Sequence, residues 1–134
     1  MGRNPKVRNG GEWTEARFWG FIRSLLRQGS IRWRPRNQCE ERARRPAVPE
    51  DGYNKQTKWV YQCCECKCWK NRKGMEIDHI IPAGELRKAE DLPGFVSRLF
   101  CEVDGFQMLC IDCNNAKKEA VRKAKKDAER TLCD

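Results

Sequence analysis

The chain has 134 residues, of which 39% are hydrophobic and 35% are charged, so it can bury only a modest apolar core. No stretch approaches the roughly 18 consecutive apolar residues that cross a bilayer, and the N-terminus lacks the apolar segment of a signal peptide. These features argue against a membrane protein and a secreted protein. We therefore expect one small intracellular domain with appendages, stabilised by a metal ion.

The formal charge of +9 is distributed unevenly along the chain. Residues 1–48 carry 12 Lys and Arg against 4 Asp and Glu, residues 49–113 carry 9 against 11, and residues 114–134 carry 7 against 4. Basic flanks favour a polyanionic partner, because neutralised phosphates release condensed counterions. The alternative is that the charge serves solubility alone.

The N-terminal region is predicted to contain a disordered basic lead-in over residues 1–11 and one amphipathic helix. Thr14 is the expected N-cap, Trp13 is placed to pack on Phe18, and Gly29 is expected to end the helix. A buried stripe is predicted from the helical repeat of Phe18, Phe21, Ile22, Leu25 and Leu26.

An arginine-rich arm follows and, with the helix, makes up a predicted region over residues 12–56. The arginine-rich arm has no sustained periodicity, although residues 38–45 are compatible with a short charged helix before Pro46. Arginine forks can bind two phosphate oxygens at once, and Trp33 can stack on a base or anchor the segment. Nucleic-acid contact is predicted for Arg32, Arg34, Arg36, Arg42, Arg44 and Arg45, with a solvated linker as the alternative.

The central region, residues 57–118, shows strand and helix patterns around two cysteine pairs. Strands are predicted at residues 57–62 and 75–81, the second ended by Pro82. Short helices are expected at residues 86–90 and 94–100, where Phe95, Leu99 and Phe100 can pack. A lysine- and alanine-rich helix is expected over residues 114–132, and residues 119–134 form a basic tail.

Two pairs of cysteines have the spacing of zinc knuckles: Cys63-x-x-Cys66 and Cys110-x-x-Cys113. Four thiolates complete the tetrahedron that Zn²⁺ accepts at a structural site, which leaves no open position for water. Cys64 and Cys68 lie in the same cluster and offer alternative ligands on the first side. The two-residue spacing, directly after a strand, favours Cys63 and Cys66.

Three motifs, taken in chain order, resemble the HNH endonucleases of the ββα-metal class. They are the first knuckle, Glu76-Ile77-Asp78-His79-Ile80-Ile81-Pro82 and Leu109-Cys110-x-x-Cys113-Asn114-x-x-Lys117. The likeness is to small phage-encoded members, including those of T7-like phages, and covers roughly residues 57–118. It implies an α+β fold with a ββα-metal core braced by a four-cysteine zinc site. The implied partner is DNA, in the host cytoplasm if the chain is phage-encoded.

The resemblance also implies the roles of individual residues. Asp78 and Asn114 would hold one catalytic Mg²⁺ or Mn²⁺, and His79 would act as general base on water. Lys117 and Lys118 are placed to contact phosphate near this site. Glu76 is given no ligand role.

The sequence departs from the family pattern at two positions. Gly105 stands where the middle asparagine is expected, and Asn114 replaces the last histidine. If the middle residue normally braces the loop of the base, Asp104 or a backbone group must take over. Two alternatives to a nuclease therefore remain open: a zinc-stabilised nucleic-acid-binding module without catalysis, and a zinc domain for protein interaction.

Overall fold

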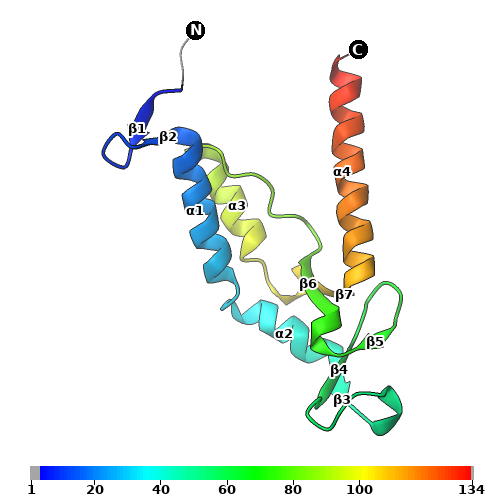
Figure 1. The fold of residues 1–134 in the computed structure, drawn as a ribbon. Coiled ribbons are helices and arrows are strands. Elements are labelled where there is room, and N and C mark those ends of the chain that lie inside the picture. The colour runs from blue at the N-terminus through cyan, green and yellow to red at the C-terminus, as the bar shows by residue number, and fades with distance from the viewer. Residues whose placement is uncertain (1–3, 134) are drawn as a thin grey trace. The chain divides into compact units, whose positions relative to one another are not determined.

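The computed structural model describes residues 4–133, so residues 1–3 of the expected lead-in and residue 134 of the tail lie outside the described residues. Helices and strands are both present, and the fold is α+β (Figure 1). The chain divides into two compact units. Unit 1 comprises residues 1–38 and 79–106, and unit 2 comprises residues 39–78 and 107–134. None of the helices within residues 4–133 is long and apolar enough to cross a membrane.

The first element of unit 1 is a small antiparallel hairpin of β1 (Lys6–Arg8) and β2 (Trp13–Thr14). Strand β1 lies within the lead-in that was expected to be disordered, so that prediction is wrong for these residues. Helix α1 (Glu15–Ser30) follows, and the Thr14 side chain accepts a hydrogen bond from the Arg17 backbone N–H at 3.2 Å. The predicted N-cap is therefore confirmed, whereas Trp13 makes its ring contact with Phe21 rather than with Phe18.

Helix α1 lies beside α3 (Leu92–Leu99), and the two helices enclose the core of unit 1 (Figure 1). The buried residues of this core are Trp19, Ala83, Leu86, Phe95 and Leu99. Phe18, Ile22 and Leu26 pack against them, but Phe21 and Leu25 are 45% and 48% exposed. The buried face of α1 thus includes Trp19 and omits two members of the predicted stripe, because α3 covers only one side of it.

The arginine-rich segment has regular structure. Helix α2 (Arg34–Ala43) begins four residues before the expected short helix, and β3 (Arg44–Pro46) takes up its predicted end. Trp33 precedes α2 and is anchored within unit 1: its indole N–H donates to the Cys101 carbonyl at 2.6 Å, and its ring meets Phe100 edge to face. Trp33 is therefore an anchor of this segment.

Unit 2 contains one small sheet and most residues of a second. Strand β4 (Trp59–Gln62) pairs antiparallel with β3 on one side and with β5 (Trp69–Lys70) on the other. Strands β6 (Met75–His79) and β7 (Phe106–Cys110) form a second, two-stranded sheet. The core between them is made by Tyr61, Cys63, Met75, Met108, Leu109 and Cys110.

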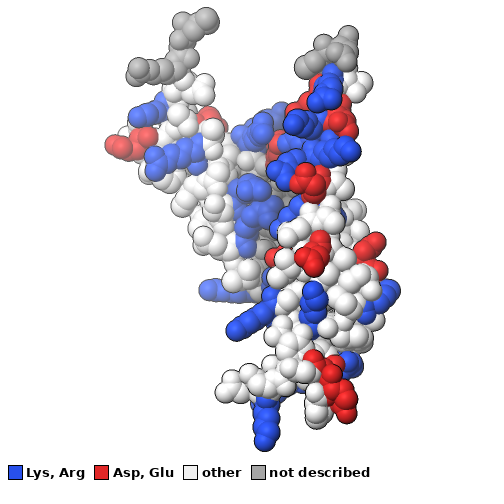
Figure 2. Space-filling view, turned by 45° about the vertical axis from the view of Figure 1, so that its right-hand side comes forward, with Lys and Arg blue, Asp and Glu red and all other residues white. Residues whose placement is uncertain are grey.

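Short turns and one long helix complete the chain. The helix expected at residues 86–90 is a single 3₁₀ turn at Ala89–Asp91, one of four such turns within residues 4–133. The others are Pro49–Asp51, Arg72–Gly74 and Val103–Gly105. Helix α4 (Ile111–Cys133) begins directly after β7, so Asn114 lies within its first turn rather than at its start. Lys and Arg side chains gather along α4, interspersed with Asp and Glu (Figure 2).

Candidate metal centre and acidic site

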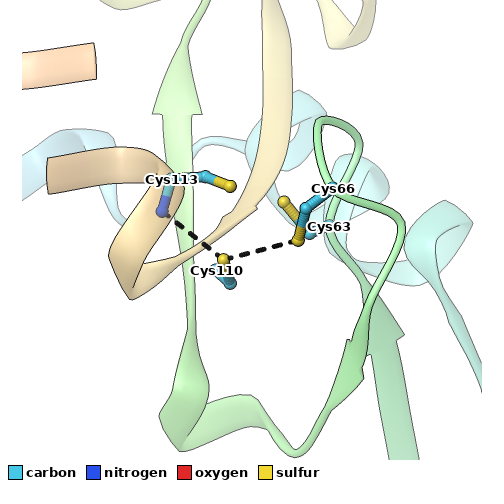
Figure 3. Close-up of side chains that lie close together, drawn as sticks. All are labelled: Cys63, Cys66, Cys110 and Cys113. Carbon is cyan, nitrogen blue, oxygen red and sulfur yellow. Dashed lines mark hydrogen bonds between the residues drawn. The ribbon is translucent and has the colours of Figure 1, made fainter. Parts of the chain in front are cut away.

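The four knuckle cysteines come together within unit 2. Their sulfur atoms all lie within 4.8 Å of one another, and they point toward a common centre (Figure 3). Cys63 and Cys66 come from the turn after β4, and Cys110 and Cys113 come from the end of β7 and the start of α4. Zn–S bonds of about 2.3 Å in a tetrahedron place sulfur atoms about 3.8 Å apart. The Cys66 and Cys110 sulfurs are 3.8 Å apart, so the cluster could hold a zinc ion.

Backbone hydrogen bonds shape the first knuckle. The N–H of Cys63 donates to the Cys68 carbonyl at 2.9 Å, and the N–H of Lys67 donates to the Cys63 carbonyl at 3.0 Å. Lys67 adopts a left-handed conformation, with φ of 64°, which closes the turn. Burial raises the pKa of Cys63, but backbone N–H groups, first that of Cys110, lower it to about 6. The thiolate needed for metal binding is therefore favoured.

The two alternative thiols occupy different positions. The Cys68 sulfur is 3.1 Å from that of Cys66, and this hydrogen bond, followed by burial, raises the pKa of Cys68 to about 12. Cys64 instead donates to the Gln107 side-chain oxygen at 3.3 Å, and burial raises its pKa. Cys64 is thus directed to another partner, and Cys68 is a neighbour of the four-cysteine cluster.

A second polar cluster in unit 2 is carried by β6 and α4. Because side chains alternate along a strand, Glu76 and Asp78 share one face of β6, while Met75 and Ile77 pack in the core. Oδ2 of Asp78 accepts a hydrogen bond from the Gln107 amide at 2.9 Å and also contacts the Lys117 ammonium. The Asn114 amide nitrogen donates to Oε2 of Glu76.

Oδ1 of Asn114 is buried without a hydrogen-bond partner within residues 4–133, in a residue that is only 4% exposed. The contacts described above for Asp78 and Glu76 involve Oδ2 and Oε2. An unsatisfied buried acceptor costs roughly 1–3 kcal/mol, so such an atom is a candidate ligand for a cation.

His79 has its own set of contacts within unit 1. Its Nε2 lies 2.9 Å from the Leu99 carbonyl oxygen, and its ring lies against Phe106 with centroids 4.7 Å apart. A carbonyl oxygen can only accept, so Nε2 carries the proton and Nδ1 is the basic nitrogen of the neutral ring. The next residue, Ile80, donates its backbone N–H to the Gly105 carbonyl at 2.9 Å.

The predicted phosphate-binding residues have varied surroundings. Arg32, Arg34 and Arg42 are exposed and Arg36 is half-buried. Lys118 lies 3.8 Å from Glu76. Arg44 stacks on Trp59, whereas Arg45 stacks on Trp69 and makes a two-bond ion pair with Asp51 at 2.9 and 3.1 Å. The guanidinium of Arg45 is thus held by Asp51 and Trp69 of the same unit.

The chain matches no family model, no curated protein and no solved structure. Its membership of the HNH family therefore stays a prediction from the sequence pattern. Any functional assignment must be supported by the residues of the site themselves.

Two residues of the acidic site were not predicted as such. Glu76 was given no ligand role, although its position two residues before Asp78 on a strand is a sufficient signal for a shared face. Gln107 was missed because it lies on β7, which the sequence pattern did not predict. The described contacts place both residues beside the predicted ligands Asp78 and Asn114.

Proposed function

We propose that the chain is a metal-dependent endonuclease of the HNH type that hydrolyses DNA phosphodiester bonds. The observation that carries the proposal is the buried, unpartnered Oδ1 of Asn114 beside carboxylates of β6. A protein does not ordinarily leave such an acceptor unsatisfied, and cation binding satisfies it. The four-cysteine cluster supports the proposal, because Cys110 and Cys113 fix the turn of α4 that carries Asn114.

The donor atoms suit a hard divalent cation. Carboxylate and amide oxygens are preferred by Mg²⁺ and Mn²⁺, and Asp78 and Asn114 would hold the ion with Glu76 beside them. A cation bound there would act as a Lewis acid toward a phosphate oxygen and toward the departing 3′ oxygen. The zinc site has four protein ligands and would serve the fold alone.

His79 is the proposed general base. The Leu99 carbonyl fixes the tautomer, so Nδ1 takes the proton of a water molecule whose oxygen attacks phosphorus. The P–O3′ bond breaks, which leaves a 5′-phosphate and, after protonation from solvent, a 3′-hydroxyl. Asp78 and His79 are consecutive, with Cα atoms about 3.8 Å apart, and their side chains leave opposite faces of β6.

Basic residues of unit 2 would bind the DNA backbone. Lys117 and Gln107, the two partners of Asp78, also line a pocket of about 330 Å³. A phosphate entering this pocket could replace Asp78 as the partner of Lys117. The remaining lysines of α4 supply diffuse attraction that weakens with salt.

The experiment is cleavage of supercoiled plasmid by the zinc-loaded chain in Mg²⁺ or Mn²⁺. Wild type is expected to nick or linearise the plasmid, and His79→Ala is expected to lose roughly 100-fold to 10,000-fold in rate. Equal cleavage by a folded, zinc-loaded His79→Ala chain would contradict the role of His79.

A second candidate function is nucleic-acid binding without catalysis. The observation that favours it is the pairing of Asp78 with Lys117, which neutralises a carboxylate needed for cation binding. Binding of the plasmid without any nicking, over the same metal series, would support this alternative.

A further inference from the structure

A pocket of about 500 Å³ lies beside β4, within unit 2. It is lined by two aromatic rings, three basic side chains and several amides, with no carboxylate among the lining residues. The lining consists of Asn54, Gln56, Thr57, Lys58, Trp59, Tyr61, Asn71, Arg72 and Lys73. This composition suits a negatively charged ligand that also has a flat π face.

Trp59 offers such a ligand a stacking surface. It is 38% exposed. The Arg44 guanidinium lies 4.1 Å from the ring centroid, yet Arg44 is absent from the pocket lining. Arg44 therefore covers the ring from outside the pocket and holds it in place, while the ring itself lines the pocket.

The basic side chains differ in their availability. Arg72 is held by Glu40 at 3.2 Å and by the Met75 carbonyl at 2.7 Å. Lys58 and Lys73 are exposed and have no side-chain partner within the described part of the chain. Two ammonium groups are thus available for phosphate next to the aromatic ring.

The walls of the pocket are fixed by hydrogen bonds. The Asn71 backbone N–H donates to the Tyr53 hydroxyl at 3.1 Å, which joins the two loops that face each other. The side-chain oxygens of Asn54 and Asn71 accept from the backbone N–H groups of Gln56 and Gly74. The NH₂ groups of both asparagines remain as donors for the edge of a base.

We infer that this pocket binds an unpaired nucleotide of a single strand. The base stacks on Trp59, and the flanking phosphates lie at Lys58 and Lys73. A paired base is already stacked within its duplex, so a nucleotide must be unpaired to enter. The inference requires neither a catalytic cation nor His79, and so it does not depend on the proposed nuclease activity.

The position of the pocket along the chain relates it to the acidic site of unit 2. Lys73 lies two residues before β6, and Asp78 is the fourth residue of that strand. Five residues of extended chain span at most about 18 Å. The backbones of Lys73 and Asp78 therefore lie no more than about 18 Å apart.

The test uses fluorescence anisotropy of a labelled oligothymidine of eight nucleotides with the zinc-loaded full chain, without Mg²⁺ or Mn²⁺. Trp59→Ala is expected to weaken binding about tenfold, and Trp59→Phe is expected to keep most of the affinity. Trp69→Ala is the matched control, because Trp69 is exposed on the same sheet and stacks on Arg45 but does not line the pocket. Lys73→Gln and Lys55→Gln form a second matched pair for the same binding measurement. Lys73 lines the pocket, and Lys55, which does not, is the control.

Two further ligands separate stacking from charge. An eight-unit abasic strand has the same charge without bases, and the Trp59→Ala effect is expected to disappear with it. Duplex DNA of the same length is expected to show less than a twofold effect of Trp59→Ala. Unchanged affinity of folded Trp59→Ala for oligothymidine, or an equal loss for duplex and for single strand, would overturn the inference.

Discussion

The backbone carbonyl of Gly105 accepts a hydrogen bond from the backbone N–H of Ile80, 2.9 Å away. This bond fixes the residue directly after His79. A backbone group of Gly105 thus braces the segment of the proposed base, which is one of the two replacements expected for the missing asparagine. A side chain at this position would require Cys101 to shift, because an added Cβ would lie 2.5 Å from the Cys101 sulfur.

The first prediction concerns this contact. Gly105→Ala is expected to lower the free energy of unfolding by about 1–3 kcal/mol, because the new methyl group overlaps Cys101. Combining it with Cys101→Ala should recover part of the loss. Gly20→Ala is the control, because Gly20 lies in α1 with nothing within 4 Å of the added Cβ and is expected to gain up to about 1 kcal/mol. Chemical denaturation measures all three variants, and a Gly105→Ala chain as stable as wild type would show that this segment rearranges freely.

The second prediction concerns the cysteine cluster. Cys110→Ser is expected to lose zinc and much of the stability of unit 2, since structural zinc in small domains supplies about 10–16 kcal/mol of binding free energy. Cys64→Ser is expected to keep one zinc per chain, because Cys64 contacts Gln107. Metal analysis and thermal unfolding provide the measurements.

Cys68→Ser decides which thiols serve on the first side of the cluster. It is expected to retain zinc, while Cys66→Ser is expected to release it. The reverse result would identify Cys68 as the ligand in place of Cys66.

The sequence was most informative where local chemistry determines structure. The side chain of Thr14 predicted the start of α1, and cysteine spacing predicted the cluster that the structure assembles. Strand β4 and helix α3 also lie where the pattern placed them, within a few residues. The cap, the two-residue cysteine spacing and the buried repeat are each local signals, although the cluster joins two cysteine pairs that lie far apart in the chain.

Apart from the cysteine cluster, structure that depends on distant partners was not predicted. Arg44 and Arg45 lie in a strand because they pair with Tyr61 and Val60, more than a dozen residues away. The exposure of Phe21 depends on which side of α1 meets α3. Gln107 joins the acidic site only because β7 pairs with β6.

The third prediction concerns acid stability. Arg45 donates two hydrogen bonds to Asp51, and these, followed by the Val48 backbone N–H, lower the pKa of the Asp51 carboxyl below its usual 3.8. The unfolded chain then takes up this proton at higher pH than the folded chain. The stabilisation is therefore present above about pH 3.8 and is lost as the pH falls through the folded pKa.

Arg45→Gln should accordingly lower stability at pH 6 and make the loss of stability between pH 4 and pH 2 less steep. Arg44→Gln is the control, because Arg44 stacks on Trp59 and has no part in the Asp51 pair. Urea unfolding at a series of pH values measures both variants. Identical pH profiles for wild type and Arg45→Gln would show that the pair has no energetic role.

The fourth prediction concerns the Lys117 contact with Asp78. Lys117→Met removes the ammonium that competes with a cation for this carboxylate, so Mn²⁺ is expected to bind more tightly. Lys118→Met is the control, since Lys118 lies 3.8 Å from Glu76 and is more exposed. Calorimetric titration with Mn²⁺ measures the change. Weaker binding in Lys117→Met would mean that the lysine organises the site rather than competing for it.

The dependence of plasmid cleavage on Mn²⁺ concentration tests the proposed endonuclease most directly. Asn114 has the unpartnered buried oxygen, and its exposed neighbour Asn115 provides a matched control. Wild type and Asn115→Ala are expected to reach the same maximal rate at the same Mn²⁺ concentration, whereas Asn114→Ala should need at least about tenfold more Mn²⁺ or lose cleavage. Cleavage by Asn114→Ala with the Mn²⁺ dependence of wild type, or no metal-dependent cleavage by wild type, would contradict the account.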